Sequence, residues 1–179
     1  MKIDPKMDPT SKQYKEMVAE FLSRLDPTKP SGTRLCDAIM RLWPTPAFEA
    51  MAFRQRSGAT EIYLRRRAMD DTAYPGEWHA PGLLYRDGEQ DRDVANRLEK
   101  EFGVPIKEFE LVGKEITSEA RGTVHSMIFM VQLDGEPRID DRHNFFPLNA
   151  LPQVTVDVHR EFIIPAATKV YWRRFLQRR

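Results

Sequence analysis

The spacing of apolar residues near the start of the chain predicts two amphipathic helices. In the first, apolar residues recur every three or four positions, the period of a helix with one buried face: Tyr14, Met17, Val18, Phe21, Leu22 and Leu25. Thr10 and Gln13 are spaced as a capping box at its start. The breaker sequence DPTKPSG (26–32) ends this helix. In the second helix, one face carries Leu35, Ala38, Ile39 and Leu42.

After Pro44 and Pro46 the pattern changes to one typical of strands. Four stretches are predicted as strands, the first two joined by a turn at Ser57-Gly58: 47–55, 61–67, 109–116 and 123–133. Residues 145–151 are predicted as a short strand or an ordered loop. The last predicted element is helical, from His159 to Leu176, and Pro165 must kink this helix or begin a second segment.

The order of these elements predicts an α+β fold with a mixed sheet between helices, because strands and helices mix without strict alternation. We divide the chain into a helical N-terminal extension, residues 1–45, and a main domain, residues 46–179. Packing of the two N-terminal helices against the main domain is the simpler expectation. A dimer contact, or a lid over a pocket, is the alternative.

Composition excludes several classes of protein. The 179 residues are 41% hydrophobic and 31% charged, as in compact globular domains, and the formal net charge is only +1. No overall field therefore favours nucleic acid or membrane binding. The N-terminus has no apolar run of a signal peptide, and no stretch reaches the roughly 20 apolar residues of a membrane span. With one cysteine, Cys36, we expect a cytoplasmic protein without disulfides.

The most informative stretch is Trp78 to Val104, WHAPGLLYRDGEQDRDVANRLEKEFGV. It predicts a glycine-containing loop and one charged helix that ends at Gly103, since glycine readily adopts the left-handed conformation after a helix. Loop–helix–loop segments rich in carboxylates can gather oxygen ligands around a divalent cation and a phosphate.

This stretch resembles the Nudix box, G-x5-E-x7-R-E-U-x-E-E-x-G-U, where U is aliphatic. Aligned from its start, the box matches at Glu89 and Arg97. Aligned from its end, it matches at Leu98, Glu101, Gly103 and Val104. The two alignments differ by one residue, so the box is one residue short between Arg97 and Leu98, where the first helix glutamate of the family belongs.

Other parts of the chain resemble the same family in the right order. Trp78 before Pro81-Gly82 is similar to the W-x-x-P-G-G that precedes Nudix boxes. FPLNALP (146–152), followed by a helix with His159, resembles the C-terminal region of the family. The resemblance spans about residues 48–164. It implies a Nudix-like α/β/α sandwich and hydrolysis of a nucleoside diphosphate linked to another group, with Mg²⁺ or Mn²⁺.

Active relatives hold the metal with three glutamates on one helix face, and this chain keeps one. The corresponding face is Arg97, Lys100 and Glu101 in one alignment, and Leu98, Glu101 and Phe102 in the other. Each neighbouring cation would oppose a bound dication by on the order of 1 kcal/mol even in high dielectric. We therefore expect Mg²⁺ or Mn²⁺ binding to be weaker than in the family.

The remaining acids and nearby cations define the candidate site. Glu101 and Glu89 are the catalytic candidates, and a rearranged metal site would use Glu101, Glu89 and Asp93. Arg66, Trp78 and Arg97 are the candidates for ligand binding. The alternative for the acids is a solvated helix face with ion pairs among Asp93, Arg97 and Glu101.

Two functions remain open at this point. The first is a Mg²⁺-dependent pyrophosphohydrolase with an impaired or rearranged metal site. The second is a catalytically inactive Nudix-like domain that binds a nucleotide-type ligand or a protein partner. Both imply a small nucleotide-type molecule or a protein as partner, and neither implies nucleic acid or a membrane; homodimer formation is left open.

Overall fold

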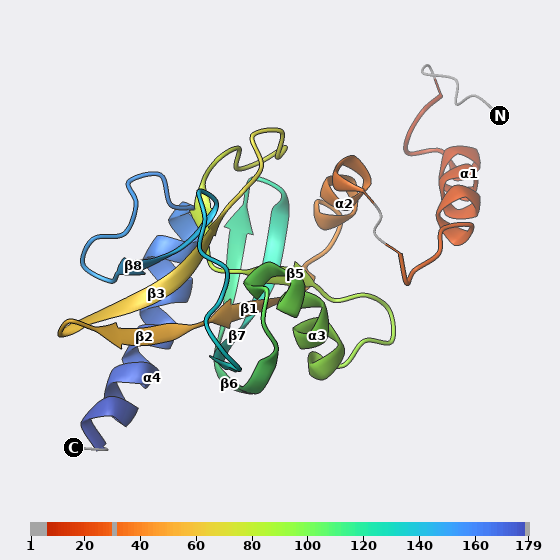
Figure 1. Ribbon diagram of the computed structural model, residues 1–179. Coiled ribbons are helices and arrows are strands. Elements are labelled where there is room, and N and C mark those ends of the chain that lie inside the picture. Colours follow the sequence, from red (N-terminus) through yellow and green to blue (C-terminus); the bar gives the residue numbers. More distant parts are fainter. Residues whose placement is uncertain (1–6, 30–31, 178–179) are drawn as a thin grey trace. The chain divides into compact units, whose positions relative to one another are not determined.

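The computed structural model describes residues 7–29 and 32–177 (Figure 1). The chain forms two compact units, Met1–Ser31 and Gly32–Arg179. The second of the two helices predicted for the N-terminal extension therefore lies in the larger unit.

In the first unit, helix α1 (Lys12–Ser23) confirms the predicted amphipathic helix. Ser11 caps it, because its hydroxyl accepts a hydrogen bond from the Tyr14 N–H at 3.2 Å. The predicted capping box is wrong, since the Thr10 hydroxyl donates to Asp8 instead. None of the residues of α1 is buried.

The second unit contains two four-stranded sheets and the remaining helices. The first sheet has the order β5-β1-β7-β6, with β1 parallel to β7 and antiparallel to β5, and β6 antiparallel to β7. In the second sheet β3 pairs with β2, β4 and β8, all antiparallel. The strands are β1 (Thr45–Met51), β2 (Phe53–Arg56), β3 (Ala59–Arg66), β4 (Trp78–His79), β5 (Gly82–Leu84), β6 (Ile106–Glu119), β7 (Gly122–Leu133) and β8 (His143–Pro147).

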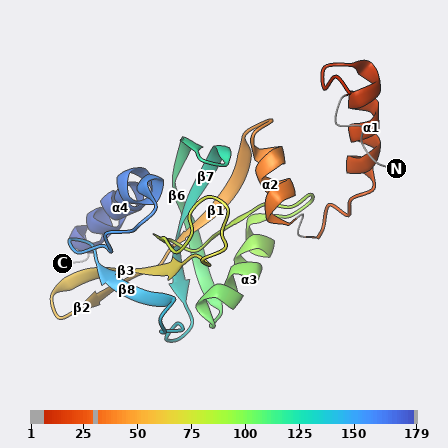
Figure 2. The same cartoon turned by 90° about the horizontal axis from the view of Figure 1, so that it is seen from above.

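The helices of this unit lie on both faces of the first sheet, and Figure 2 shows α3 and α4 on opposite sides of β1, β6 and β7. Their bounds are α2 (Thr33–Met40), α3 (Asp91–Phe102), the π-helix η1 (His159–Ile163) and α4 (Ile164–Gln177). Pro165 is the second residue of α4, which continues directly from η1, so the change from π-helix to α-helix falls next to the proline. The predicted new segment at Pro165 and the α+β class with a mixed sheet are confirmed.

Alternation along β1 divides the core into two layers. Phe48 and Ala50 face α3, where the buried side chains include Val94, Leu98 and Phe102. Met51 faces α4 and packs in a second cluster with Ile62, Leu64, Ile128 and Ile163. Each fully buried side chain of this size stabilises the fold by about 1.5–3 kcal/mol. A third, smaller cluster joins Met40 of α2 to Ala47 and Val124.

The strand predicted over residues 47–55 is in fact two strands in different sheets. β1 ends at Met51 and β2 begins at Phe53, so the chain changes sheet at Ala52. The N–H of Tyr63 donates to the Ala52 carbonyl at 2.9 Å, which joins the two sheets at this point. Among the described residues, no helix combines the length and apolar character needed to cross a bilayer.

Candidate functional site

Helix α3 and the loop before it lie where the sequence predicted them. The helix begins with a capping box between Gln90 and Asp93, in which the Asp93 carboxylate accepts the Gln90 N–H at 2.9 Å. It ends at Gly103, whose φ of 77° is left-handed as predicted. The short strands β4 and β5 within the loop were not predicted, because two or three residues carry no measurable periodicity.

Glu89 and Arg97 form an ion pair that fastens the loop to the helix. An oxygen of Glu89 lies 2.7 Å from a guanidinium nitrogen of Arg97, and the same oxygen accepts the Arg86 N–H at 2.8 Å. Arg97 also donates to the carbonyl of Leu84 at 2.8 Å. Both side chains are largely buried, and their contacts join the loop to α3.

Glu101 forms an ion pair with Arg65, at the end of β3. Their carboxylate oxygen and guanidinium nitrogen are 2.8 Å apart, and about a quarter of each side chain is exposed. Leu98 and Phe102 on the same side of α3 are fully buried in the core. The predicted acids, Glu89 in the loop before α3 and Asp93 and Glu101 within the helix, thus have three separate partners: Arg97, the Gln90 N–H and Arg65.

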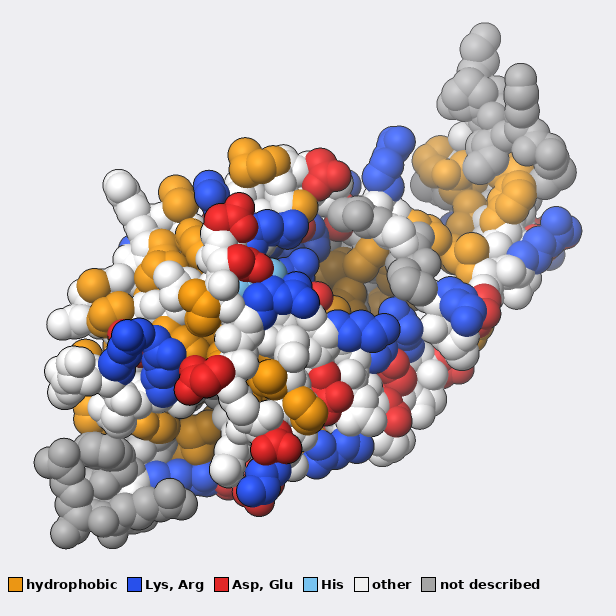
Figure 3. All heavy atoms as spheres, in the orientation of Figure 1, with side chains coloured by type: hydrophobic (Ala, Val, Ile, Leu, Met, Phe, Trp, Pro, Cys, Tyr) orange, Lys and Arg blue, Asp and Glu red, His pale blue; other side chains and the backbone are white. Residues whose placement is uncertain are grey.

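Positive charge gathers where β3 ends. Figure 3 shows Lys and Arg side chains between the loop after β3 and helix α3. Arg66 donates to the Gly76 carbonyl, and Arg142 to the Arg66 carbonyl. Burial lowers the pKa of Arg65, and the charges of Arg142 and Arg67 lower it further, whereas Glu101 raises it. The group therefore contains cations in excess of the carboxylates that neutralise them.

Trp78 packs within the protein. Its ring contacts Phe146 edge to face, with centroids 4.8 Å apart. Its backbone N–H donates to the Val154 carbonyl, and its backbone carbonyl accepts the Val156 N–H. It is half-buried against the cluster beneath α4. The structure thus gives this predicted ligand residue a packing role between β4 and the segment before η1.

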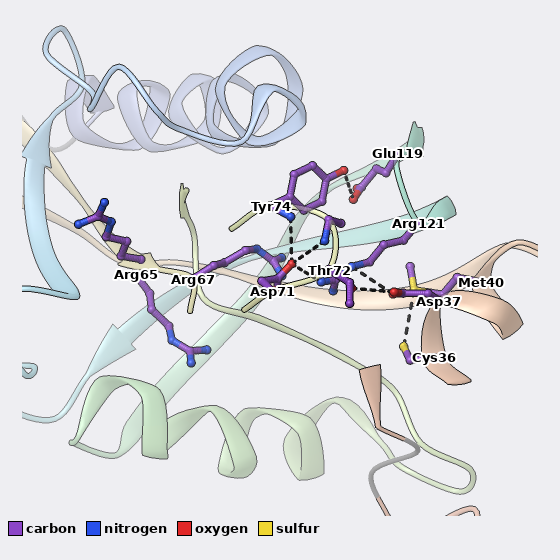
Figure 4. Close-up of polar contacts among 12 residues, drawn as sticks. Cys36, Asp37, Met40, Arg65, Arg67, Asp71, Thr72, Tyr74, Glu119 and Arg121 are labelled. Carbon is purple, nitrogen blue, oxygen red and sulfur yellow. Dashed lines mark hydrogen bonds and ion pairs between the residues drawn. The ribbon is translucent and has the colours of Figure 1, made fainter. Parts of the chain in front are cut away.

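The loop after β3 is held by a network around Asp71 (Figure 4). Asp71 pairs with Arg67 and Arg121, and Arg121 also pairs with Asp37 of α2. Burial alone would raise the pKa of Asp71, but N–H donors from Tyr74 and Ala73 and the Arg121 guanidinium hold it well below its usual value. Together these contacts join the loop, α2 and the β6–β7 hairpin.

A second group of titratable side chains, Glu49, His79 and His159, is buried on the α4 side of the first sheet. Glu49 Oε2 lies 4.0 Å from His159 Nε2. Burial, reinforced by Glu119 and opposed by Arg67, raises the pKa of Glu49 to about 8. Burial lowers the pKa of His159 to about 3 and that of His79 well below its usual value. For all three side chains, burial thus favours the uncharged form.

Sequence analysis missed this buried group, although one signal was present. Glu49 is the only charged residue of AFEAMAF (47–53), and a carboxyl in an apolar strand is either at an edge or buried for a reason. Glu49 also explains Gly82 opposite it in β5, because a Cβ there would collide with the Glu49 carboxylate. His79 and His159 come from other parts of the chain, so their proximity left no sequence pattern.

Comparison with known proteins identifies the fold of this chain but assigns it to no sequence family. The chain matches no protein-family model and no curated protein. Among solved structures, the Nudix domain of Shewanella oneidensis NrtR matches with a TM-score of 0.59 at 17% identity, over 85% of this chain and 97% of that domain. A MutT Nudix hydrolase from Burkholderia pseudomallei matches with 0.53 at 26% identity, over 66% and 94%. The chain has the Nudix fold. The C-terminal domain of mouse MUTYH, solved in complex with human PCNA, matches with 0.58 at 13% identity, over 72% and 90%.

The Nudix resemblance implies Mg²⁺ or Mn²⁺, and the side chains of α3 do not fit such an ion. Glu101 is the one carboxylate on the expected face, and a guanidinium already neutralises it. Leu98 and Phe102 offer hydrocarbon where oxygen ligands are needed. Among the residues that the structure describes, no three acidic, histidine or cysteine side chains are grouped as a metal would require.

Proposed function

We propose that this Nudix-fold domain binds a nucleotide-type ligand through its phosphate groups, without a divalent cation and without hydrolysing it. The observation that carries the proposal is the Arg65–Glu101 ion pair. In this pair a guanidinium neutralises the carboxylate that a metal site would need. A phosphate needs positive charge near it, and here that charge is part of the protein.

The cations at the end of β3 support phosphate binding. Guanidinium groups bind phosphate oxygens with paired, charge-assisted hydrogen bonds. Arg66 and Arg142 bond to carbonyl oxygens, which leaves their charge uncompensated by those contacts. Arg66, predicted from the sequence, therefore stays among the proposed ligand residues, joined by Arg65 and Arg142. Arg97 and Trp78 act indirectly, by holding the loop and β4 in place.

The similar structures are consistent with this chemistry. The NrtR Nudix domain was solved with ADP-ribose, which carries a diphosphate and an adenine ring. We take ADP-ribose as the probe for this class of ligand.

Hydrolysis with a rearranged metal is the second candidate, and one observation favours it. The side chain of Glu101 is 23% exposed, and that of its partner Arg65 is 28% exposed. A ligand that drew Arg65 away would release Glu101 to a cation.

Calorimetry with ADP-ribose tests the proposal, performed in EDTA and then in millimolar Mg²⁺, with released phosphate products measured in parallel. We expect binding in EDTA, no turnover in either condition, and an affinity at least about tenfold lower for Arg142→Gln, the loss of one charge-assisted bond. Arg173→Gln, which removes an exposed cation on α4, is the control and should bind normally.

Turnover in Mg²⁺ that Glu101→Gln abolishes would establish the second candidate instead. Absence of binding to the wild type would overturn the proposal.

A further inference from the structure

The loop of residues 67–77 orients one of the arginines proposed to bind phosphate. The Nε of Arg66 donates to the carbonyl of Gly76, near the far end of this loop, at 2.8 Å. The backbone N–H of Arg67 donates to the Glu77 carbonyl at 2.9 Å, which closes the loop at its base. Arg66 is exposed, whereas Gly76 is buried. The loop therefore supplies a buried acceptor that orients an exposed guanidinium.

The orientation of this guanidinium decides how Arg66 can bind a phosphate. The bond to Gly76 uses Nε, so the two terminal nitrogens are the pair that would make a bidentate contact with phosphate oxygens. Without the Gly76 contact, the long side chain would sample many rotamers, and binding would have to order it. The loop thus pre-organises Arg66 for an anionic ligand.

Polar contacts give the loop its shape. Within residues 67–77, all of which the structure describes, Gly76 alone is buried, so the loop has no buried apolar side chain. Asp71 folds its middle part, because Oδ1 accepts the N–H groups of Ala73 and Tyr74, each at 3.0 Å. The other oxygen of Asp71 accepts a hydrogen bond from Arg67 at 3.1 Å. All of these contacts lie within the loop.

Arg121 attaches the loop to two other elements (Figure 4). It lies in the turn between β6 and β7, and it pairs with Asp71 of the loop and, at 3.3 Å, with Asp37 of α2. Each of the three side chains is only 15% exposed, so one cation is shared by two partly desolvated carboxylates. The hydroxyls of Thr72 and Tyr74 add single hydrogen bonds to neighbouring carboxylates. Loss of Arg121 would leave two like charges without the cation that joins them.

We propose that Arg121 is a positioning residue for phosphate binding. It acts through Asp71 and the loop, whose Gly76 carbonyl directs Arg66, and it does not touch the ligand. The inference rests on the proposed function, since it applies only if Arg66 binds phosphate. It makes ligand affinity depend on α2 as well, because the second carboxylate that Arg121 holds is Asp37.

A set of variants separates positioning from folding. Arg121→Met removes both ion pairs and keeps an extended side chain, whereas Arg121→Lys keeps the charge. Arg66→Gln removes the ligand arginine, and a double variant combines it with Arg121→Met. Arg41→Met, which removes an exposed cation at the end of α2, is the control. Inorganic diphosphate is titrated into each protein in EDTA by calorimetry, and urea unfolding with circular dichroism measures the stability of each.

We expect Arg66→Gln to bind diphosphate about tenfold more weakly than the wild type, and Arg121→Met at least about threefold more weakly. Arg121→Lys should recover part of this loss, and Arg41→Met should bind like the wild type. When Arg66 is already Gln, Arg121→Met should weaken binding no further, since the arginine that it positions is gone. Its effect on stability should be the same in both backgrounds, so stability and affinity report different things.

Wild-type affinity in folded Arg121→Met would overturn the inference and leave the proposed function in place. An equal loss of affinity with and without Arg66 would also overturn it, because general loosening of the domain gives that result. If Arg121→Met does not fold, Asp71→Asn replaces it, since the amide keeps an acceptor for the Ala73 and Tyr74 N–H groups and loses the charge. Asp71→Asn should then weaken binding in the same way, and full affinity would overturn the inference. If diphosphate does not bind the wild type, the proposed function itself fails, which is a different result.

Discussion

The guanidinium of Arg65 lies 2.8 Å from the carboxylate of Glu101 and connects β3 to the C-terminal half of α3. Helix α3 begins with the Gln90–Asp93 capping box and ends at Gly103, and its carboxylate Glu101 forms an internal ion pair.

Arg65 and Glu101 should show energetic coupling. We expect Arg65→Met to lower the free energy of unfolding by about 1–3 kcal/mol, since it leaves a partly buried carboxylate unpaired. Glu101→Gln should lower the free energy of unfolding by less than Arg65→Met does. The double variant should lower it by less than the sum of the two single changes. Urea unfolding of the four proteins measures this coupling. The exposed pair Arg174–Glu110 is the control and should show little. Strict additivity for Arg65 and Glu101 would contradict the pairing.

Divalent cations should not bind to α3. We expect calorimetric titration with Mg²⁺ and Mn²⁺ at millimolar concentration to give no binding to the wild type, because one neutralised carboxylate is too few oxygen ligands. Arg65→Met should also give none, since Leu98 and Phe102 remain apolar. Binding that Glu101→Gln removes would show that the acids rearrange around the ion.

Glu89 and Arg97 should affect stability more than ligand binding. Arg97→Met removes the bonds to Glu89 and to the Leu84 carbonyl, and we expect a loss of about 2–4 kcal/mol from the unpaired, largely buried carboxylate. Thermal unfolding provides the measurement, with Arg92→Met, another α3 arginine, for comparison. A fully stable Glu89→Gln variant that has lost Mg²⁺-dependent turnover would instead support the catalytic role predicted from the sequence.

Gly82 should tolerate no side chain while Glu49 is present. Gly82→Ala places a methyl group against the Glu49 carboxylate, and we expect a destabilisation of about 1–3 kcal/mol from this overpacking. In a Glu49→Ala background the same change should have a much smaller effect, because the obstructing atoms are gone. Equal effects in the two backgrounds, measured by urea unfolding, would exclude contact with Glu49 as the cause.

Stability should change with pH in a way that depends on Glu49. Its pKa rises from an ordinary 4.5 to about 8 on folding, so between these values the folded protein keeps a proton that the unfolded chain has lost. Stability therefore falls as pH rises through this window, by at most about 1.4 kcal/mol per unit. His159, with its pKa lowered from 6.5 to about 3, has the opposite effect, as stability falls when pH drops below 6.5.

The wild type should therefore be less stable at pH 8 than at pH 6.5, where the histidines contribute little and Glu49 still titrates. Glu49→Gln should remove this difference and keep the loss of stability in acid. Urea midpoints across this range give the measurement. A wild type as stable at pH 8 as at pH 6.5 would mean that Glu49 is charged in the folded protein.

The sequence by itself determined the elements whose signals are local. Helical periodicity gave α1, the charged loop–helix segment gave α3 with its end at Gly103, and alternation gave the central strands. The order of these elements and the box residues predicted the Nudix fold. These signals are readable because a hydrogen-bonding period, a cap or a turn depends on neighbours within a few residues.

Only the tertiary structure decided which side chains meet. The change of sheet at Ala52 follows from pairing with β3 and β7, and no residue of 47–55 marks it. Arg65 reaches Glu101, and Glu49 reaches His159, because separate strands and helices pack together there. The physical reason is that partner choice, burial and the resulting charge state depend on groups distant in the chain. The carboxyl of Glu101 therefore forms an internal ion pair, whereas burial raises the pKa of the Glu49 carboxyl, although the two groups are chemically alike in the sequence.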